Sequence, residues 1–287
     1  MQQQHTDATP PRVLGRLMAM GGNEDPDEND LRLLPHFVEM CGGARARLVV
    51  CGTPSAEVEK KERTYKRLFE KIGVTSVFEA NVTERIDGEN EELIEATRSA
   101  TGVFFTGGDQ LRLTAIVAGT KFGDCVRDRL WREGLIVAGT SAGTAAMSST
   151  MLISGRNEGT VRRADIRVAP GLGYVRDIIL DTHFAQRGRI SRLLAVQAQN
   201  PEVLAVGIDE NTAIEINPSG RFTVFGAGAV FVLDGTVTHS NAADAAEEDV
   251  LAMTDSLLHV LPEGYSFDLT SMRPLLPDGS PLPHRSQ

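Results

Sequence analysis

The sequence predicts an α/β protein in which helices cover both faces of a mostly parallel sheet. Short apolar runs alternate with longer segments of helical pattern through the first half of the chain, as expected for repeated strand–helix units. The runs are nearly continuous in apolar residues, which is typical of strands buried on both faces. No linker or internal repeat divides the chain, so we expect one domain over residues 12–270, with flexible tails at 1–11 and 271–287.

The elements of the first half follow in a regular order. The predicted strands are residues 12–20, 47–51, 76–78, 102–105 and 135–138. The predicted helices are residues 31–40, 56–72, 91–99, 110–118 and 123–132, and a further helix begins at 142. Four of the strands are followed within three residues by Gly21, Gly52, Gly107 and Ser141. Because the carboxyl ends of parallel strands meet at one edge of a sheet, we expect a single site there.

The second half has shorter strands. We expect strands at residues 177–180 and 203–207, and a helix at 188–199. Residues 212–217, 221–225 and 229–233 are separated by Asn-Pro-Ser-Gly and Gly-Ala-Gly turns, and this spacing predicts a C-terminal β-meander. The proline-rich segment from Ser266 onward is expected to be irregular.

The composition argues against several classes of function. The formal net charge is −10, which disfavours nucleic acid as a partner. No apolar run reaches the about 20 residues that span a bilayer, and residues 1–11 lack the apolar core of a signal peptide, so we expect a cytoplasmic protein without membrane contact. The three cysteines have no metal-ligand spacing. The acidic run 23–30 lacks the glycine and the terminal glutamate of a calcium loop. We therefore predict no metal and no cofactor.

The segment 139–143 reads Gly-Thr-Ser-Ala-Gly, a G-x-S-x-G pattern between an apolar strand and a helix. In a nucleophile elbow the glycines allow a crowded turn that exposes the serine oxygen to a substrate carbonyl. The N–H of Ala142 would then open the helix and point at a developing oxyanion. The alternative is a glycine-rich turn without a catalytic role. The strand before the pattern and the helix after it favour the catalytic interpretation.

A serine nucleophile needs a base and a group that orients that base. His183 directly follows a predicted strand, as Ser141 does, whereas the other histidines lie in tails, on a helix or away from the strand ends. Glu210 ends another strand and could accept the imidazole N–H, with Asp181 and Asp209 as alternatives. The chain order serine, histidine, acid argues against an α/β-hydrolase, whose acid precedes the histidine. Gly107-Gly108 offers a second oxyanion donor.

Three arginines come within nine residues of His183. Arg189 and Arg192 are one helical turn apart and share a face. Guanidinium groups beside a nucleophile suit the carboxylates of a substrate. A solvated basic helix face that includes Arg187 is an equally good interpretation of the pattern.

Four segments together point to one family. They are Gly-Thr-Ser-Ala-Gly at 139–143, Phe-Thr-Gly-Gly-Asp-Gln at 105–110, Asp-x-His-Phe-x-x-Arg-x-Arg-x-x-Arg-Leu at 181–193 and Gly-Ile-Asp-Glu-Asn-Thr-Ala at 207–213. In these segments the chain resembles cyanophycinases, serine-type hydrolases of the storage polymer multi-L-arginyl-poly-L-aspartate. The resemblance extends from about Gly21 to Leu269. Its most specific part is the string at 181–193, because broader relatives share mainly the serine elbow and Gly-Gly-Asp.

The resemblance implies a fold, an assembly and a set of roles. The implied fold is the flavodoxin-like layering of class I glutamine amidotransferase-like proteins, usually as a homodimer. The implied catalytic residues are Ser141 as nucleophile, His183 as base and Glu210 as its orienting acid. The implied oxyanion donors are Gly108 and Ala142. The implied substrate-binding positions are Gln110, Asp181, Thr182, Arg187, Arg189 and Arg192. Thr182 departs from the pattern, because cyanophycinases carry glutamine there.

The resemblance also implies a substrate. Each unit of the polymer carries one guanidinium and one carboxylate, and the implied reaction is exo-hydrolysis of backbone α-peptide bonds through an acyl-enzyme, which releases β-Asp-Arg dipeptides. The arginines suit the carboxylate, whereas Asp181, Glu24 or Asp25 suit the guanidinium. The alternatives are a peptidase E-type aspartyl dipeptidase, against which the arginine string argues, and a non-catalytic module that binds arginine-rich peptides. A glutamine amidotransferase is disfavoured because its elbow carries cysteine.

Overall fold

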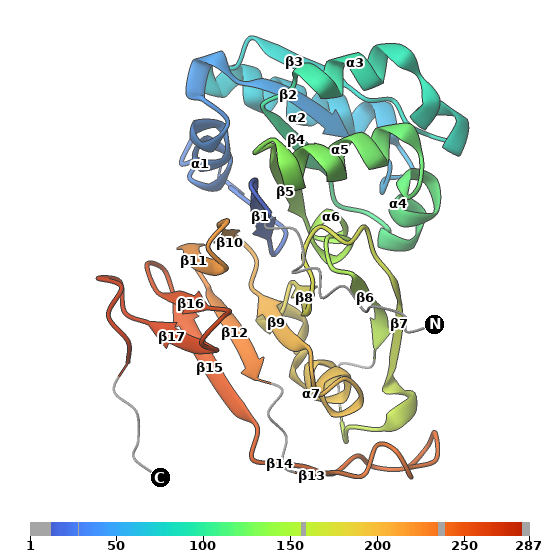
Figure 1. Cartoon of the computed structure of the whole chain (residues 1–287), viewed down its shortest axis with the longest axis vertical. Helices are drawn as coiled ribbons and strands as arrows, with labels where there is room; N and C mark the ends of the chain where they lie inside the picture. The colour runs from blue at the N-terminus through green and yellow to red at the C-terminus, as the bar shows by residue number, and fades with distance from the viewer. Residues whose placement is uncertain (1–12, 28, 156–158, 235–238, 283–287) are drawn as a thin grey trace, which may run out of the picture.

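The computed structural model describes residues 13–27, 29–155, 159–234 and 239–282 (Figure 1). The expected tail at 1–11 and the end of the chain from 283 lie outside these ranges. The helices are α1 (Leu33–Met40), α2 (Val58–Ile72), α3 (Glu91–Ser99), α4 (Gln110–Val117), α5 (Lys121–Arg132), α6 (Ala142–Ala145) and α7 (Ile190–Gln199). Short 3₁₀ turns are η1 (Gly43–Arg45), η2 (Arg85–Glu89), η3 (Arg163–Asp165) and η4 (Ala185–Arg187).

The main sheet has nine strands in the order β17-β16-β11-β10-β1-β5-β4-β2-β3. Their bounds are β1 (Arg16–Met20), β2 (Arg47–Cys51), β3 (Ser76–Glu79), β4 (Gly102–Phe105), β5 (Ile136–Thr140), β10 (Thr212–Ile216), β11 (Arg221–Gly226), β16 (Ser266–Asp268) and β17 (Arg273–Leu275). The strands β1 to β5 pair in parallel. If β2, β3, β4 and β5 are numbered 1 to 4, their order in the sheet is 2-1-3-4, as in a flavodoxin-like sheet. The predicted fold class is therefore confirmed.

Helices cover both faces of this parallel part because alternate side chains of each strand point to opposite faces. Met18 and Met20 of β1 pack in one core with Phe37 of α1 and Phe69 of α2. Leu17 and Ala19 pack in the other core, to which α3, α4 and α5 contribute Leu93, Leu113, Val117, Phe122, Val126 and Leu130. The strongly polar outer face of α2 remains in water, as its charged sequence requires.

A second sheet has the order β15-β12-β9-β8. Its strands are β8 (Ile178–Thr182), β9 (Leu204–Ile208), β12 (Ala229–Asp234) and β15 (Leu257–Pro262). Only β8 and β9 are parallel, and α7 packs its Leu193 and Val196 against Ile179 and Ala205 of these two strands. Two hairpins complete the chain, β6 (Thr150–Gly155) with β7 (Ile166–Pro170) and β13 (His239–Ser240) with β14 (Met253–Thr254). Figure 1 shows the second sheet below the parallel part.

The C-terminal part differs from the predicted meander. Strands β10 and β11 form the expected antiparallel hairpin, but β12 leaves the main sheet and pairs with β9 and β15. Val230 and Val232 face one core and Phe231 packs near the other, so β12 is apolar on both faces and lies inside a sheet. The segment after Ser266 is not irregular, because β16 adds to β11 and β17 adds to β16.

Within the described ranges, no helix is both long and apolar enough to cross a lipid bilayer.

Candidate active site

Ser141 occupies a strained turn between β5 and α6. Its backbone has φ 51° and ψ −109°, a conformation that costs an ordinary residue of the order of 1–3 kcal/mol and persists only where the surroundings enforce it. The Ser141 N–H donates to Met20 O of the neighbouring β1 at 3.1 Å. Behind the turn a Cβ on Gly143 would lie 2.4 Å from Phe105 O, so only glycine allows this close approach. The predicted elbow is therefore present, although its helix ends already at Ala145.

Thr144 fixes the elbow to β1. The oxygen of its buried hydroxyl lies 2.7 Å from Met20 O and 2.6 Å from Gly139 O, and the hydroxyl proton can be donated to either. The same oxygen accepts from Met20 N at 2.9 Å. The turn is thus held by backbone contacts and by the buried Thr144 hydroxyl.

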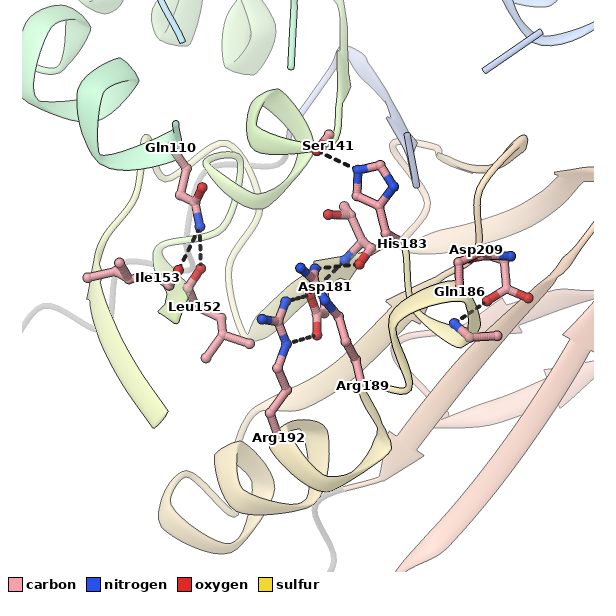
Figure 2. A network of polar contacts seen from close by, with 12 residues as sticks. Gln110, Ser141, Leu152, Ile153, Asp181, His183, Gln186, Arg189, Arg192 and Asp209 are labelled. Carbon is pink, nitrogen blue, oxygen red and sulfur yellow. Dashed lines mark hydrogen bonds and ion pairs between the residues drawn. The ribbon is translucent and has the colours of Figure 1, made fainter. Parts of the chain in front are cut away.

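The structure brings Ser141, His183 and Glu210 into one chain of contacts (Figure 2 shows the serine and the histidine). Ser141 Oγ lies 2.8 Å from His183 Nε2, and His183 Nδ1 lies 2.7 Å from Glu210 Oε1. With the proton on Nδ1, the imidazole donates to the carboxylate and accepts from the hydroxyl. This is the arrangement that a general base for a serine requires.

The positions of His183 and Glu210 come from turns after β8 and β9. His183 has φ 49°, and its N–H donates to Gly21 O at 2.8 Å. The imidazole lies against Gly22, where a Cβ would come within 2.3 Å of Cε1. Glu210 Oε2 accepts from Asn23 Nδ2 at 3.0 Å, so the loop after β1 also orients the acid.

Burial lowers the pKa of His183, and the hydrogen bond to Glu210 raises it in part. That same hydrogen bond is the main reason why the pKa of Glu210 is lowered. Together the two groups keep a neutral imidazole next to an ionised carboxylate near neutral pH.

The two alternative acids have other partners. Asp209 accepts from the backbone N–H of Ala185 at 2.9 Å and of Ala229 at 3.1 Å, so it ties the turn after β9 to its neighbours. Asp181 is 2% exposed and forms ion pairs with Arg189 and Arg192. Of the three candidates, Glu210 alone contacts the imidazole in the described structure.

Gly108 and Ala142, the expected oxyanion donors, both lie beside Ser141 and line the same cavity of about 190 Å³. Among the described residues, the N–H of Gly108 has no hydrogen-bond partner. The loop 52–55 supports this turn, because Pro54 O accepts from Asp109 N at 2.9 Å.

This cavity, called here the arginine cavity, is lined by Gln110, Arg187, Arg189 and Arg192 together with Asp181 and Thr182. Arg192 Nε donates to Asp181 Oδ2 at 2.6 Å, and Arg189 Nη1 donates to Asp181 Oδ1 at 3.0 Å (Figure 2). Arg189 and Arg192 are 9% and 7% exposed, which corrects the alternative of a solvated basic face. Burial lowers the pKa of Arg189 to about 10, although Asp181 acts in the opposite direction.

The pairing changes what each group can do. Asp181 is committed to two guanidinium groups and is not free for a guanidinium of the substrate. Arg187 is exposed and has no ion-pair partner in the described part of the chain. The Gln110 amide nitrogen donates to Leu152 O at 2.9 Å and Ile153 O at 3.1 Å, which leaves its oxygen as an acceptor. Thr182 is buried in the wall of the cavity.

A second cavity of about 560 Å³, called here the glutamate cavity, also reaches Ser141 and is lined by Glu24, Tyr65, Thr140 and His183. Glu24 accepts hydrogen bonds from the Tyr65 and Thr140 hydroxyls. Asp25, the other expected partner for a guanidinium, is buried and instead caps α1, because its carboxylate accepts from Arg32 N, Leu33 N and Leu34 N. The sequence did not point to Tyr65, whose position on the apolar side of α2 indicates only a core residue.

Comparisons with known proteins identify the family to which the chain belongs. The pattern of peptidase family S51 matches residues 17–223. Cyanophycinases of Synechococcus elongatus and Geminocystis herdmanii are 34% and 32% identical over 89% and 90% of this chain, which covers 79% and 95% of those proteins. The cyanophycinase of Trichormus variabilis is 33% identical over 91% of this chain and 88% of its own length.

Two solved structures share the fold. A peptidase from an acI-B1 actinobacterium has a TM-score of 0.62 at 20% identity, over 87% of this chain and 98% of that one. A putative peptidase E of Listeria monocytogenes has a TM-score of 0.51 at 16% identity, over 75% of this chain and 99% of that one. The family pattern and the three relatives each extend over most of the chain, which therefore belongs to peptidase family S51 and is a serine-type peptidase.

Proposed function

We propose that this chain is an exo-acting cyanophycinase, which hydrolyses backbone α-peptide bonds of multi-L-arginyl-poly-L-aspartate and releases β-Asp-Arg dipeptides. The observation that carries the proposal is the contact chain Ser141–His183–Glu210 beside a cavity lined by three arginines. A net positive cavity next to a nucleophile suits a substrate that presents a carboxylate on every unit. The cyanophycinases that resemble the chain over most of its length support the same substrate.

In the proposed mechanism, Ser141 Oγ attacks the carbonyl carbon of the scissile bond and its proton passes to His183 Nε2. Glu210 stabilises the resulting imidazolium and holds the imidazole in the required tautomer. Gly108 and Ala142 donate their N–H groups to the oxyanion. The imidazolium then protonates the leaving amine, and the C–N bond breaks to leave an ester on Ser141. Water, deprotonated by His183, attacks this ester and releases the acid product.

Substrate binding is assigned to the arginine cavity. Arg187 has no ion-pair partner among the described residues and can meet a substrate carboxylate, and Gln110 offers an amide oxygen. Asp181 acts as a positioning residue, since it aligns Arg189 and Arg192 through charge-assisted hydrogen bonds. Thr182 contributes to the wall with a shorter side chain than the glutamine of the cyanophycinase pattern. The homodimer and the cytoplasmic location expected from the sequence stay predictions.

The test is digestion of the purified polymer by the full chain, with the products identified by mass spectrometry over time. We expect β-Asp-Arg as the first and main product, with a slow decrease in polymer length as exo-cleavage requires. Ser141→Ala should lose at least about 10⁴-fold in rate and still bind the polymer. Random internal fragments would contradict exo-cleavage. Cleavage of aspartyl dipeptides with no action on the polymer would favour the peptidase E-type alternative.

A further inference from the structure

The glutamate cavity and the arginine cavity adjoin each other at Ser141. Of the described residues, only Gly108 and Ser141 line both of them. A peptide bond attacked at this shared boundary can place one neighbouring unit in each cavity. The two cavities differ in chemistry, because the first contains the Glu24 carboxylate and the second contains three guanidinium groups.

His183 determines which cavity receives which side of the scissile bond. The imidazole must give its proton to the leaving amine, so the leaving unit has to lie on the side of Nε2. His183 lines the glutamate cavity, and it is not among the described residues that line the arginine cavity. The geometry thus places the leaving unit in the glutamate cavity and the acyl unit in the arginine cavity.

The hydrogen bonds of Glu24 orient its carboxylate for a cation in the glutamate cavity. Its two carboxylate oxygens accept from Tyr65 and Thr140, which belong to α2 and to the end of β5. Burial and the Glu24 carboxylate raise the pKa of Tyr65, so the phenol stays a donor. Each carboxylate oxygen retains a further lone pair for a guanidinium N–H. The two hydroxyls thus hold both carboxylate oxygens in place.

The lysines of the glutamate cavity leave Glu24 without a cation of its own among the described residues. Lys60 Nζ pairs with Glu57 Oε2 at 2.9 Å. Lys61 Nζ lies over the outer side of the Tyr65 ring, 5.7 Å from its centre. Both lysines belong to α2, and neither contacts Glu24 in the described structure.

Resting on the proposed function, we propose that Glu24 is the specificity-determining residue for the leaving unit, and that it binds the guanidinium of that unit's arginine. The arginine cavity binds the carboxylate of the acyl unit, and the glutamate cavity binds the guanidinium of the leaving unit. Loss of the Glu24 contact therefore slows acylation, in which the leaving unit is present, and leaves deacylation unchanged.

The experiment uses three synthetic substrates that consist of two β-Asp-Arg units joined by one α-peptide bond. One is the parent, one carries citrulline in the leaving unit, and one carries citrulline in the acyl unit. Citrulline keeps the shape of arginine and lacks its charge. The full chain, Glu24→Gln and the control Glu59→Gln are compared. Glu59 lies on α2, the helix that carries Tyr65; it is exposed and pairs with Arg63 outside the cavity.

For the wild type and the Glu59→Gln control, we expect citrulline in the leaving unit to lower kcat/KM by about tenfold to a hundredfold. Glu24→Gln should lower kcat/KM for the parent by a similar factor and should no longer distinguish the parent from the leaving-unit citrulline substrate. The single-turnover rate of deacylation should be the same in all three proteins.

Three results would overturn the proposal. If the wild type cleaves the parent and the leaving-unit citrulline substrate equally well, there is no cation site for the leaving unit. This comparison needs no variant. If Glu24→Gln instead no longer distinguished the parent from the acyl-unit citrulline substrate, the assignment of the two cavities would be reversed. Equal slowing of all substrates, together with slower deacylation, would make Glu24 a purely structural support of Thr140 and Ser141. If the wild type leaves even the parent intact, the proposed polymer activity fails instead.

Discussion

The proposed nucleophile Ser141 and its proposed base His183 come from two sheets that are built in different ways. Ser141 follows β5, a strand paired on both sides by parallel neighbours, and backbone and threonine contacts enforce its turn. His183 and Glu210 follow β8 and β9 of the second sheet, and side-chain hydrogen bonds align them. Backbone geometry therefore fixes the proposed nucleophile, whereas side-chain hydrogen bonds orient the proposed base. Changes at single side chains of the second sheet should therefore alter activity in graded steps.

The largest of these steps is expected for Glu210→Gln. The amide can donate to Nδ1 and so favour the wrong tautomer of His183, which should lower kcat by about 10⁴-fold. The exposed Glu202→Gln, close to the start of β9, is the matched control and should keep full activity. Steady-state rates on the polymer test this. Near-full activity of Glu210→Gln would show that another group orients the imidazole.

Asp181→Asn tests the side-chain support of the arginine cavity. Removal of this charge leaves two buried guanidinium groups unpaired, and the breaking of a buried pair typically costs about 3–5 kcal/mol. We expect a drop in Tm of the order of 10 °C and a fall in kcat/KM of about a hundredfold, because Arg189 and Arg192 lose their alignment. A variant with unchanged Tm would mean that the three groups are solvated in solution.

Arg187→Ala sharpens the contrast within the same cluster. Arg187 is exposed and unpaired in the described structure, so its loss should leave Tm nearly unchanged. One charged hydrogen bond to a substrate carboxylate contributes about 1.5–3 kcal/mol, so kcat/KM should fall about tenfold to a hundredfold. The fall should vanish on polymer whose arginine carboxylates are amidated. Equal losses on both polymers would remove Arg187 from carboxylate recognition.

The smallest effect concerns pH. The reaction needs a neutral imidazole, and the pKa of His183 is below its usual 6.5 because of burial. kcat/KM should therefore be flat from pH 7 to 8 and fall only as the pH decreases through this lowered pKa. Since Glu210 raises the pKa of His183, Glu210→Gln should move the acid limb to still lower pH. The measurement is the pH profile of kcat/KM for both proteins, and an acid limb centred above 6.5 would contradict the burial of the base.

Local patterns determined the first half of the fold and the Ser141 elbow. The parallel strands, the helices between them and the Ser141 elbow each arise from contiguous residues, so hydrophobic periodicity and glycine positions suffice to locate them. The carboxyl edge of the sheet as the place of the site follows from the same pattern, since parallel strands bring their ends together. His183 and the arginine string could be found because each follows closely after a strand or another member of the site.

Contacts between distant segments decided the rest. The sequence favoured Glu210 as the acid but left Asp181 and Asp209 as alternatives. Neighbouring residues on a turn point in different directions, and only the packed chain shows which carboxylate meets the imidazole. The pairing of Asp181 with two arginines likewise depends on how α7 lies against β8. The transfer of β12 to the second sheet, and the addition of β16 and β17 to the first, depend on strand pairing across many residues. Such pairing is set by the burial of both faces of a strand in the assembled core and leaves no local signature.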